Sequence, residues 1–214
     1  MPQFTSYPRR YNSLRLVGYE YNSIFKLCAI TMVTDLRRPV FADIKLAKSV
    51  LSCLLSEQTL TYMRVRAFTL LPDHLHLLAG IREPESNLST LIGRFKSYTT
   101  QIYWARSREI LQSRHVALPP KCISGSDSIE TRRVLSALLD WRATLCPEVI
   151  ALKNWPAAKP GHFTKKHLWQ THFFDHVIRN DDDLRRNVDY IAMNPVHAGY
   201  VTRPEFYPYT AFLE

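Results

Sequence analysis

A length of 214 residues suits one domain, or one domain that carries an insertion, and a hydrophobic content of 46% excludes general disorder. The net charge of +9 favours a polyanionic partner, and it lies in residues 1–160, whose balance is +10 against −1 in residues 161–214. No apolar run is long enough to span a membrane, and residues 1–10 lack the apolar core of a signal peptide. We therefore expect a cytoplasmic protein with no membrane partner.

The four cysteines do not support a zinc site. Cys28, Cys53, Cys122 and Cys146 include no C-x-x-C pair, which a zinc knuckle or ribbon would need. We expect them to be buried or half-buried thiols in a reducing compartment.

The first elements alternate strand and helix. Residues 25–34 are apolar and β-branched and predict a buried strand. Asp43 can cap a helix that presents one apolar stripe. Residues 63–71 and 74–81 predict two strands, which Pro72 and Asp73 separate, so that they pair as a hairpin. The helical stripe consists of Ile44, Ala47, Val50, Leu51, Leu54 and Leu55.

A long helix follows, for which Ser86 and Asn87 offer caps. Its apolar positions, at helical spacing, are Leu88, Leu91, Ile92, Phe95, Thr99 and Ile102. The outer face is basic and offers DNA contacts at Arg94, Lys96, Arg106 and Arg108. The pattern loosens over residues 107–161, which we interpret as an insertion of loops with one amphipathic helix over Ile129–Leu145. We expect no side chain of this insertion to take part in catalysis.

Order returns with a short strand over residues 172–178 and a helix that Asn180 or Asp181 can cap. Leu184, Val188 and Ile191 form the buried stripe of this helix. With the insertion set aside, the order β-α-β-β-α-β followed by a helix predicts an α+β fold of the ferredoxin-like, split βαβ type. Residues 1–214 would form a single domain, with helices on one face of an antiparallel sheet and a C-terminal catalytic helix.

His74 and His76 are the first candidates for chemistry. Alternation along a strand places both imidazoles on the same face, with Leu75 on the other, a spacing that suits two metal ligands. The alternative is two polar residues on a half-exposed strand, because an H-x-H motif alone is weak evidence.

Tyr190 is the second candidate, because it lies beside the buried stripe of the last helix. Asn194 is one turn further along the same face and Asn187 lies three residues before. A tyrosine beside an amide oxygen and near a histidine pair would be a nucleophile next to a third metal ligand. Pro195 directly follows Asn194 and disfavours helical geometry there, so we expect some distortion of this alignment.

Several blocks of the sequence resemble the HUH-type single-tyrosine transposases, and most closely the REP-associated tyrosine transposases. They are residues 67–78 (AFTLLPDHLHLL), 168–180 (LWQTHFFDHVIRN) and 189–201 (DYIAMNPVHAGYV), together with Phe95-Lys96-Ser97. They follow the family order and cover nearly the whole chain outside residues 107–161, a span longer than the family pattern.

The resemblance implies a role for each matched position. His74 and His76 correspond to metal ligands, Tyr190 to the nucleophile and Asn194 to the third ligand. It assigns no role to the matched residues Trp169, Gln170, Asp175 and Arg179, for which packing and DNA contact are both open.

The implied function is a DNA transesterase that binds single-stranded hairpins of repetitive extragenic palindromes and works near the nucleoid, as a monomer or homodimer. Tyr190 would form a 5′-phosphotyrosine and release a 3′-OH, and reversal would rejoin strands without ATP. The cofactor would be Mg²⁺ or Mn²⁺, since Mg²⁺ prefers oxygen ligands whereas imidazole suits Mn²⁺ better.

Three other functions stay open from the residues alone. A hairpin-binding module without cleavage would keep the fold but would not need the four site residues. A metal-dependent nuclease that uses water would leave no protein–DNA adduct. A plain RNA-binding protein of this fold would carry aromatic residues on the sheet face where this sequence has histidines.

Overall fold

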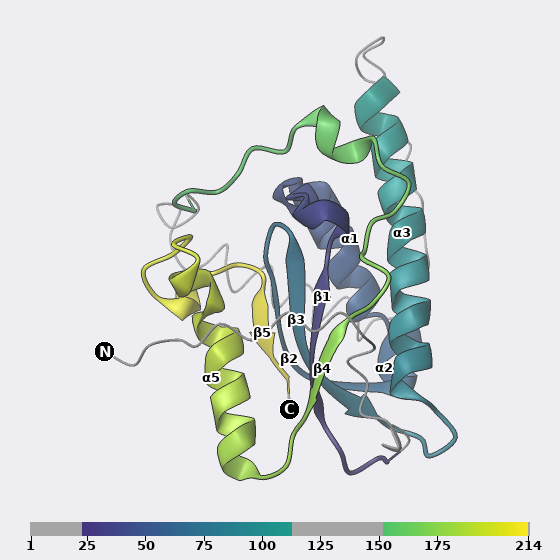
Figure 1. The fold of residues 1–214 in the computed structure, drawn as a ribbon, viewed down its shortest axis with the longest axis vertical. Helices are drawn as coiled ribbons and strands as arrows, with labels where there is room; N and C mark the ends of the chain where they lie inside the picture. The colour runs from purple at the N-terminus through teal and green to yellow at the C-terminus, as the bar shows by residue number, and fades with distance from the viewer. Residues whose placement is uncertain (1–22, 113–151, 214) are drawn as a thin grey trace.

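The computed structural model describes residues 23–112 and 152–213. Within these ranges the chain forms a five-stranded antiparallel sheet in the order β4-β1-β3-β2-β5 (Figure 1). Its strands are Cys28–Val33 (β1), Met63–Leu70 (β2), His74–Ile81 (β3), Phe174–Val177 (β4) and Thr210–Phe212 (β5). The first four strands confirm the predicted ferredoxin-like plan, and β5 is an added edge strand from the C-terminal tail.

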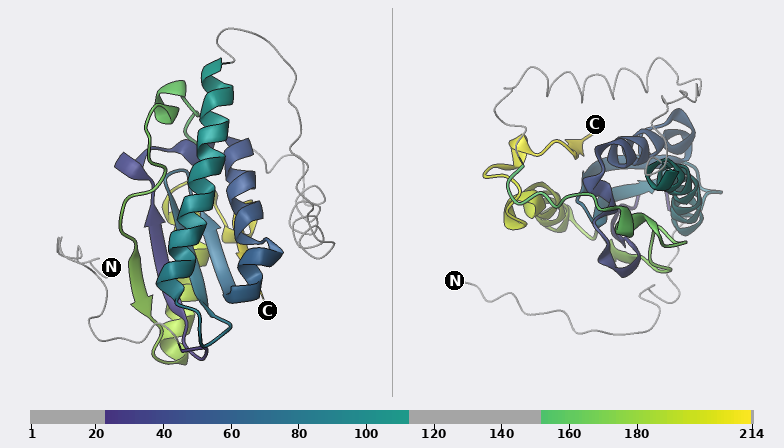
Figure 2. Two further views of the ribbon diagram at one scale, coloured as in Figure 1. Left: turned by 90° about the vertical axis from the view of Figure 1, so that its right-hand side faces the viewer. Right: turned by 90° about the horizontal axis from the view of Figure 1, so that it is seen from above.

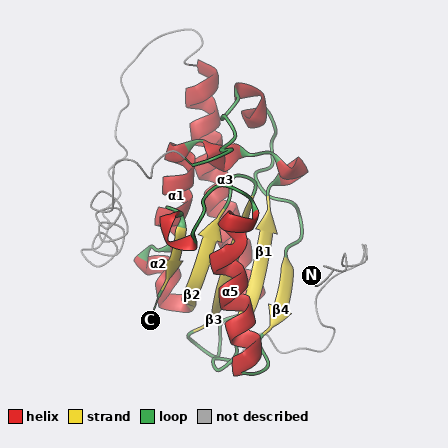
Figure 3. Ribbon diagram, turned by 90° about the vertical axis from the view of Figure 1, so that its left-hand side faces the viewer, coloured by secondary structure: helices red, strands yellow, loops and turns green. Residues whose placement is uncertain are grey.

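Helices cover both faces of the sheet. Helices Ile44–Leu54 (α1) and Leu88–Gln112 (α3) lie on one face, as Figure 2 shows from their side. Helix Asp181–His197 (α5) crosses the opposite face (Figure 3). Helices α1 and α3 cover one face of the sheet, as expected, and α5 covers the other face as well. The shorter helices are Glu57–Tyr62 (α2), Asp35–Arg37 (η1), Val40–Ala42 (η2), Pro160–Phe163 (η4) and Pro204–Phe206 (η5).

Local capping and burial explain where the helices begin. Asp43 accepts a hydrogen bond from Leu46 N and so caps α1, and Asn180 does the same for α5 through Asp183 N. The main core lies between the sheet and α1 and α3. A smaller cluster built on Ala67, Leu78 and Ile191 joins the sheet to α5. No helix in the described part of the chain is both long and apolar enough to cross a membrane.

The span interpreted as an insertion is shorter than expected, since both of its ends belong to the fold. Helix α3 continues to Gln112 because Tyr103 and Ser107 extend its buried stripe. At the other end, Trp155 packs against Tyr200 and Tyr209, with ring centroids 5.3 and 5.8 Å apart. The predicted helix Ile129–Leu145, together with Cys122 and Cys146, lies outside the described residues.

The two described cysteines are free thiols, as expected. Burial raises the pKa of Cys28 to about 12 and that of Cys53 to about 11, so both stay protonated at neutral pH. Neither has the thiolate character that a reactive cysteine needs.

Candidate active site

The histidine pair lies on the sheet face that α5 covers. Strand β3 runs in the sheet between β1 and β2, and its alternation places His74 and His76 together, with ring centroids 4.8 Å apart. Leu75 faces the main core on the other side. His76 is buried, with 5% of its surface exposed, whereas His74 is half-buried.

Each imidazole has its Nδ1 atom engaged by a neighbouring side chain. His74 Nδ1 lies 2.6 Å from Asp73 Oδ1, and Asp73 in turn binds Arg37 at 3.2 Å. His76 Nδ1 lies 2.8 Å from Thr31 Oγ1 on the adjacent strand β1. With Nδ1 protonated in both rings, each Nε2 keeps its lone pair, which is the arrangement that metal-binding histidines use.

Helix α5 brings the amide and the phenol to this pair. The Asn194 Nδ2 amide donates to His76 Nε2 at 3.0 Å, and the Tyr190 ring centroid lies 5.1 Å from that of His76. Tyr190 is 50% exposed, so its phenol meets both the site and solvent. Residues 118 positions apart in the chain are thus in direct contact.

The distortion expected at Asn194 does not occur. Helix α5 runs through Pro195 to His197, and Asn194 O accepts the hydrogen bond from Ala198 N. Pro195 is buried in the last turn of the helix, where packing outweighs the local preference of a residue before proline. Asn187 does not join the site, because its amide donates to Asp183 O at 2.8 Å.

Burial sets the charge state of the site. It lowers the pKa of His76 to about 3, with a further electrostatic contribution from the neighbouring His74, so His76 is a neutral imidazole at neutral pH. Burial alone would raise the pKa of Asp73, but hydrogen bonds and charges from His74 and Arg37 outweigh it and lower that pKa. Asp73 is therefore a carboxylate that orients His74.

His74, His76 and Asn194 could hold a divalent ion, although they offer few donor atoms. The described residues hold no group of three or more His, Cys, Asp and Glu side chains suited to a metal. A third ligand would have to be the Asn194 amide oxygen, so an ion would replace the hydrogen bond between Asn194 and His76. Two neutral imidazoles and one amide leave coordination positions for phosphate oxygens and water.

The start of α5 is anchored by a network that sequence reasoning did not identify. Asp183 is buried and accepts hydrogen bonds from His176 Nε2 at 2.9 Å and from Arg179 N at 3.1 Å. Asn187 Nδ2 lies 3.2 Å from the same carboxylate. In the sequence, Asp183 is one of three consecutive acids at a helix start, and nothing in its position distinguishes it from Asp182.

Thr31, Arg37 and Asp73 also escaped sequence reasoning, because their partners are distant in the chain or belong to the histidine pair itself. In the sequence, Asp73 stands out only as part of the break between two predicted strands. A carboxylate directly before an H-x-H motif was the one local signal available.

Of the four basic side chains on α3 that were predicted to contact DNA, two are exposed and two are bound to other parts of the protein. Arg94 and Arg108 are exposed on α3. Arg106 instead binds Asp43 at 2.7 Å and Glu109 at 2.8 Å. Lys96 donates to Gln170 O at 2.5 Å and to Thr171 O at 3.0 Å. The side chains of Lys96 and Arg106 therefore both stabilise the fold.

The matched positions without an assigned role are mostly structural. Trp169 is buried and donates from Nε1 to Thr99 Oγ1 at 2.8 Å. Gln170 bonds through its backbone N to Val33 O at 2.9 Å. Asp175 pairs with Ile30 across β1 and β4, and Arg179 is exposed, with its backbone N on Asp183. Among these four residues, only Arg179 presents an exposed cation.

Parts of this chain are similar in sequence to known proteins. Residues 26–117 match the model of a family described as transposase IS200 like. A putative REP-associated tyrosine transposase of Haemophilus influenzae is 26% identical over 146 residues, 68% of this chain and 57% of that protein. The REP-associated tyrosine transposase of Escherichia coli is 45% identical over 47 residues, 22% of this chain and 28% of that protein. The chain therefore spans less than two thirds of the length of either relative.

A solved structure described as a REP-associated tyrosine transposase bound to a REP hairpin aligns with 97% of this chain and 82% of that one, with a TM-score of 0.44 and 17% identity. The family match contains His74 and His76 and ends before α5. Over residues 26–117, the range that contains β1 to α3, the chain is therefore similar to IS200-like transposases, and it is also similar to REP-associated tyrosine transposases.

Proposed function

We propose that this protein is a single-tyrosine DNA transesterase that binds single-stranded hairpins of the REP type and cleaves and rejoins them through Tyr190. The observation that carries the proposal is the meeting of two histidines from β3 with an amide and a tyrosine from α5. The relatives, whose names describe REP-associated tyrosine transposases, support the choice of DNA.

The reaction needs a phenol that can reach a phosphate. The Tyr190 oxygen would bond to the scissile phosphorus while the bond from phosphorus to the 3′ oxygen breaks. The phenol proton passes to solvent, and the departing 3′ oxygen takes up a proton to become a hydroxyl. The 5′ phosphate stays on the tyrosine, and attack by another 3′-OH reverses the step without any energy source.

A divalent ion, Mg²⁺ or Mn²⁺, would be held by His74, His76 and Asn194. When bound, it would withdraw charge from the phosphate, because a phenol of ordinary pKa, about 10, is a weak nucleophile at neutral pH. Asp73 and Thr31 orient the two imidazoles, and the burial of His76 keeps its ring neutral and able to bind.

The deciding experiment is a covalent-adduct assay with a labelled single-stranded hairpin and Mg²⁺ or Mn²⁺. We expect a protein–DNA adduct on denaturing gels, with the 5′ phosphate on a peptide that contains Tyr190. Tyr190→Phe keeps the ring and its packing, so it should remove cleavage and adduct together while leaving hairpin affinity near that of the wild type.

Tyr98→Phe is the matched control, because Tyr98 is 48% exposed but lies on α3, across the sheet from the site. It should cleave like the wild type. Cleavage without an adduct would instead identify a nuclease that uses water, and hairpin binding without cleavage would identify a binding module.

A further inference from the structure

One segment of the chain carries cations and no acids. Between Glu148 and Asp175 the sequence has four lysines and three histidines but no Asp or Glu. Residues 159–171 of this stretch, which we call the basic strap, run alongside α3 towards β4 (Figure 1). The strap is strongly basic even though residues 161–214 as a whole balance to −1, because the acids of that region gather on and around α5.

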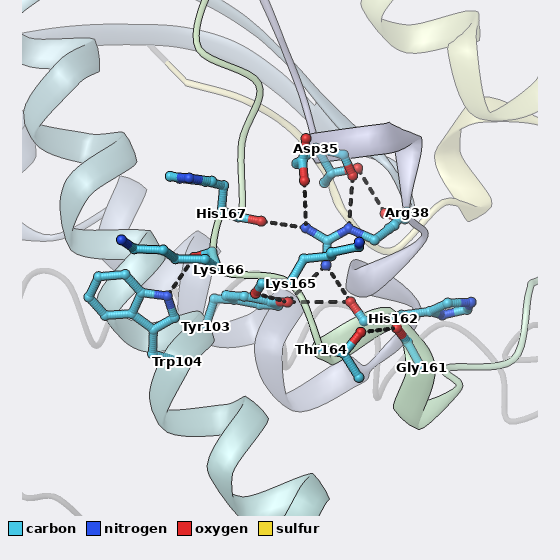
Figure 4. Close-up of polar contacts among 11 residues, drawn as sticks. Asp35, Arg38, Tyr103, Trp104, Gly161, His162, Thr164, Lys165, Lys166 and His167 are labelled. Atoms are coloured by element: carbon cyan, nitrogen blue, oxygen red, sulfur yellow. Dashed lines mark hydrogen bonds and ion pairs between the residues drawn. The ribbon is translucent and has the colours of Figure 1, made fainter.

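The strap is held from beneath by side chains that bind its carbonyl groups (Figure 4). Buried Arg38 donates to His162 O and to His167 O. The Tyr103 hydroxyl donates to Lys165 O at 3.0 Å. The backbone therefore has a fixed course, although the strap is not part of a helix or strand over most of its length.

Its cationic side chains are left outside. Lys159, Lys165, Lys166 and His167 are all exposed. Within residues 23–112 and 152–213, none of the three lysines takes part in an ion pair, in contrast to Arg106. Exposed ammonium groups without an ion-pair partner, on a fixed backbone, suit contact with the phosphates of a DNA strand.

An exposed aromatic side chain lies against the strap. Trp104 is 43% exposed, and its Nε1 donates to Lys166 O at 2.7 Å, which fixes the indole beside Lys166 (Figure 4). Bases stack on such rings regardless of their sequence, provided that the strand is single. The combination favours single-stranded DNA over a duplex stem, whose bases would be hidden.

The strap also touches the elements that carry the candidate active site. Leu168 O accepts from Asp35 N at 2.8 Å, and Gln170 N donates to Val33 O at 2.9 Å. The intervening Thr34 donates from its N to Asp73 O at 2.8 Å. The strap and the residue before the histidine pair are therefore joined through the backbone around Thr34, and the exposed side chain of Arg37 binds Asp73.

We propose that the basic strap binds the single-stranded DNA that flanks the hairpin and leads it to Tyr190; this rests on the proposed function. A groove of about 760 Å³ between α1, α2 and α3 is the competing surface, with Lys45 and Arg94 on its wall. That groove lies across the sheet from α5, and its third cation, Arg106, is neutralised by Asp43 and Glu109.

The test compares two DNA hairpins in a binding assay with the full chain and a chelator present. One hairpin carries oligo(dT) tails of about ten nucleotides, within the range that single-strand sites cover, and the other has none. The test variant is Lys165→Gln/Lys166→Gln, and the control is Lys45→Gln/Lys48→Gln, which removes two exposed lysines from α1.

We expect the test variant to weaken binding of the tailed hairpin on the order of tenfold and to reduce its salt slope by about 1.4, the value for two lost phosphate contacts. Binding of the tailless hairpin, and all binding by the control variant, should stay unchanged. The proposal is wrong if the wild type shows no preference for tails, if the variant loses equally on both hairpins, or if only the control pair weakens tail binding.

A second assay tests the proposed function by itself. Mg²⁺ or Mn²⁺ is added in place of the chelator, and adduct formation by the wild type is measured. Tail binding through the strap without any adduct would refute the transesterase and leave the strap in place. An adduct without tail-dependent binding would refute the role of the strap and support the transesterase.

Discussion

At the scale of single residues, the buried imidazole of His76 is the side chain that links the residues of β1, β3 and α5 in the candidate site. It touches Thr31 on β1, His74 on its own strand and both Tyr190 and Asn194 on α5. Burial keeps the ring neutral, and the neighbours fix its orientation. A side chain with this set of contacts can transmit a change in any one of them to the other residues of the candidate site.

His76→Ala should abolish cleavage and adduct formation while changing hairpin affinity by less than about threefold, because phosphate contacts elsewhere supply most of the affinity. His74→Ala and an excess of chelator should have the same effect. Gel assays of cleavage and anisotropy measurements of binding check both parts. Full activity in excess chelator would remove the metal from the proposal.

Thr31→Val tests the orientation of His76 without changing any of the proposed metal ligands. The change is nearly isosteric and removes only the acceptor of the His76 Nδ1 hydrogen bond. Loss of such a supporting contact typically costs about 10–100-fold in metal affinity or activity. Calorimetric titration with Mn²⁺ should show weaker binding by Thr31→Val, whereas Thr61→Val, on exposed α2, should bind Mn²⁺ like the wild type.

At the scale of elements, α5 carries the proposed nucleophile, so its attachment to the sheet decides where Tyr190 lies. Its start is held by the contacts of Asp183 with β4 and with Arg179 N, and its middle by Ile191 on the small second core. The buried apolar cluster that joins α5 to the sheet is small, so polar anchors matter more here than under α1 and α3.

Asp183→Asn should lower cleavage more than hairpin binding, because it loosens the helix without removing a DNA contact. The hydrogen bond from His176 is the main cause of the lowered pKa of Asp183, so the anchor is present above the unfolded pKa of about 3.9 and is lost as pH falls through the folded value. Hydrogen exchange of α5 amides should be faster in the variant, and Asp182→Asn, an exposed neighbour, should change nothing.

The ion pair between Arg106 and Asp43 joins α3 to the start of α1, and Arg106→Ala should therefore affect stability rather than DNA binding. Both side chains are mostly buried, 20% and 12% exposed, and we expect a loss of about 2 kcal/mol in the free energy of unfolding. Urea denaturation measures this loss.

The pH dependence of that difference follows from Asp43. Burial raises its pKa, but the Arg106 hydrogen bond and charge outweigh burial and lower it. The contribution should therefore be constant at neutral pH and shrink below about pH 4, as Asp43 takes up a proton. A tenfold loss of hairpin affinity in Arg106→Ala, with stability unchanged, would return Arg106 to the DNA contacts.

At the scale of the whole molecule, the net charge of +9 predicts binding of hairpin DNA that weakens steeply with salt. Between about 50 and 200 mM NaCl, affinity should fall at least about tenfold, since each phosphate contact releases condensed counterions. Anisotropy titrations at several salt concentrations give the slope. Binding that is insensitive to salt would show that the basic surface does not contact DNA.

The sequence by itself determined the elements whose signals are local. Alternation placed His74 and His76 on one face of a strand, and helical spacing put Tyr190 and Asn194 on one face of α5. Caps such as Asp43 and Asn180 marked helix starts correctly, because capping depends on residues three positions away. The fold class followed from the order of these elements.

Only the tertiary structure decided which side chains meet across the chain. Helical spacing could not tell that Lys96 and Arg106 are engaged within the fold, while Lys165 and Lys166 stay exposed. It could not show that Asp183 anchors α5 or that Thr31 orients His76. Periodicity reports which face of an element is apolar, but a hydrogen bond or ion pair depends on partners that only the packing of distant segments brings within reach.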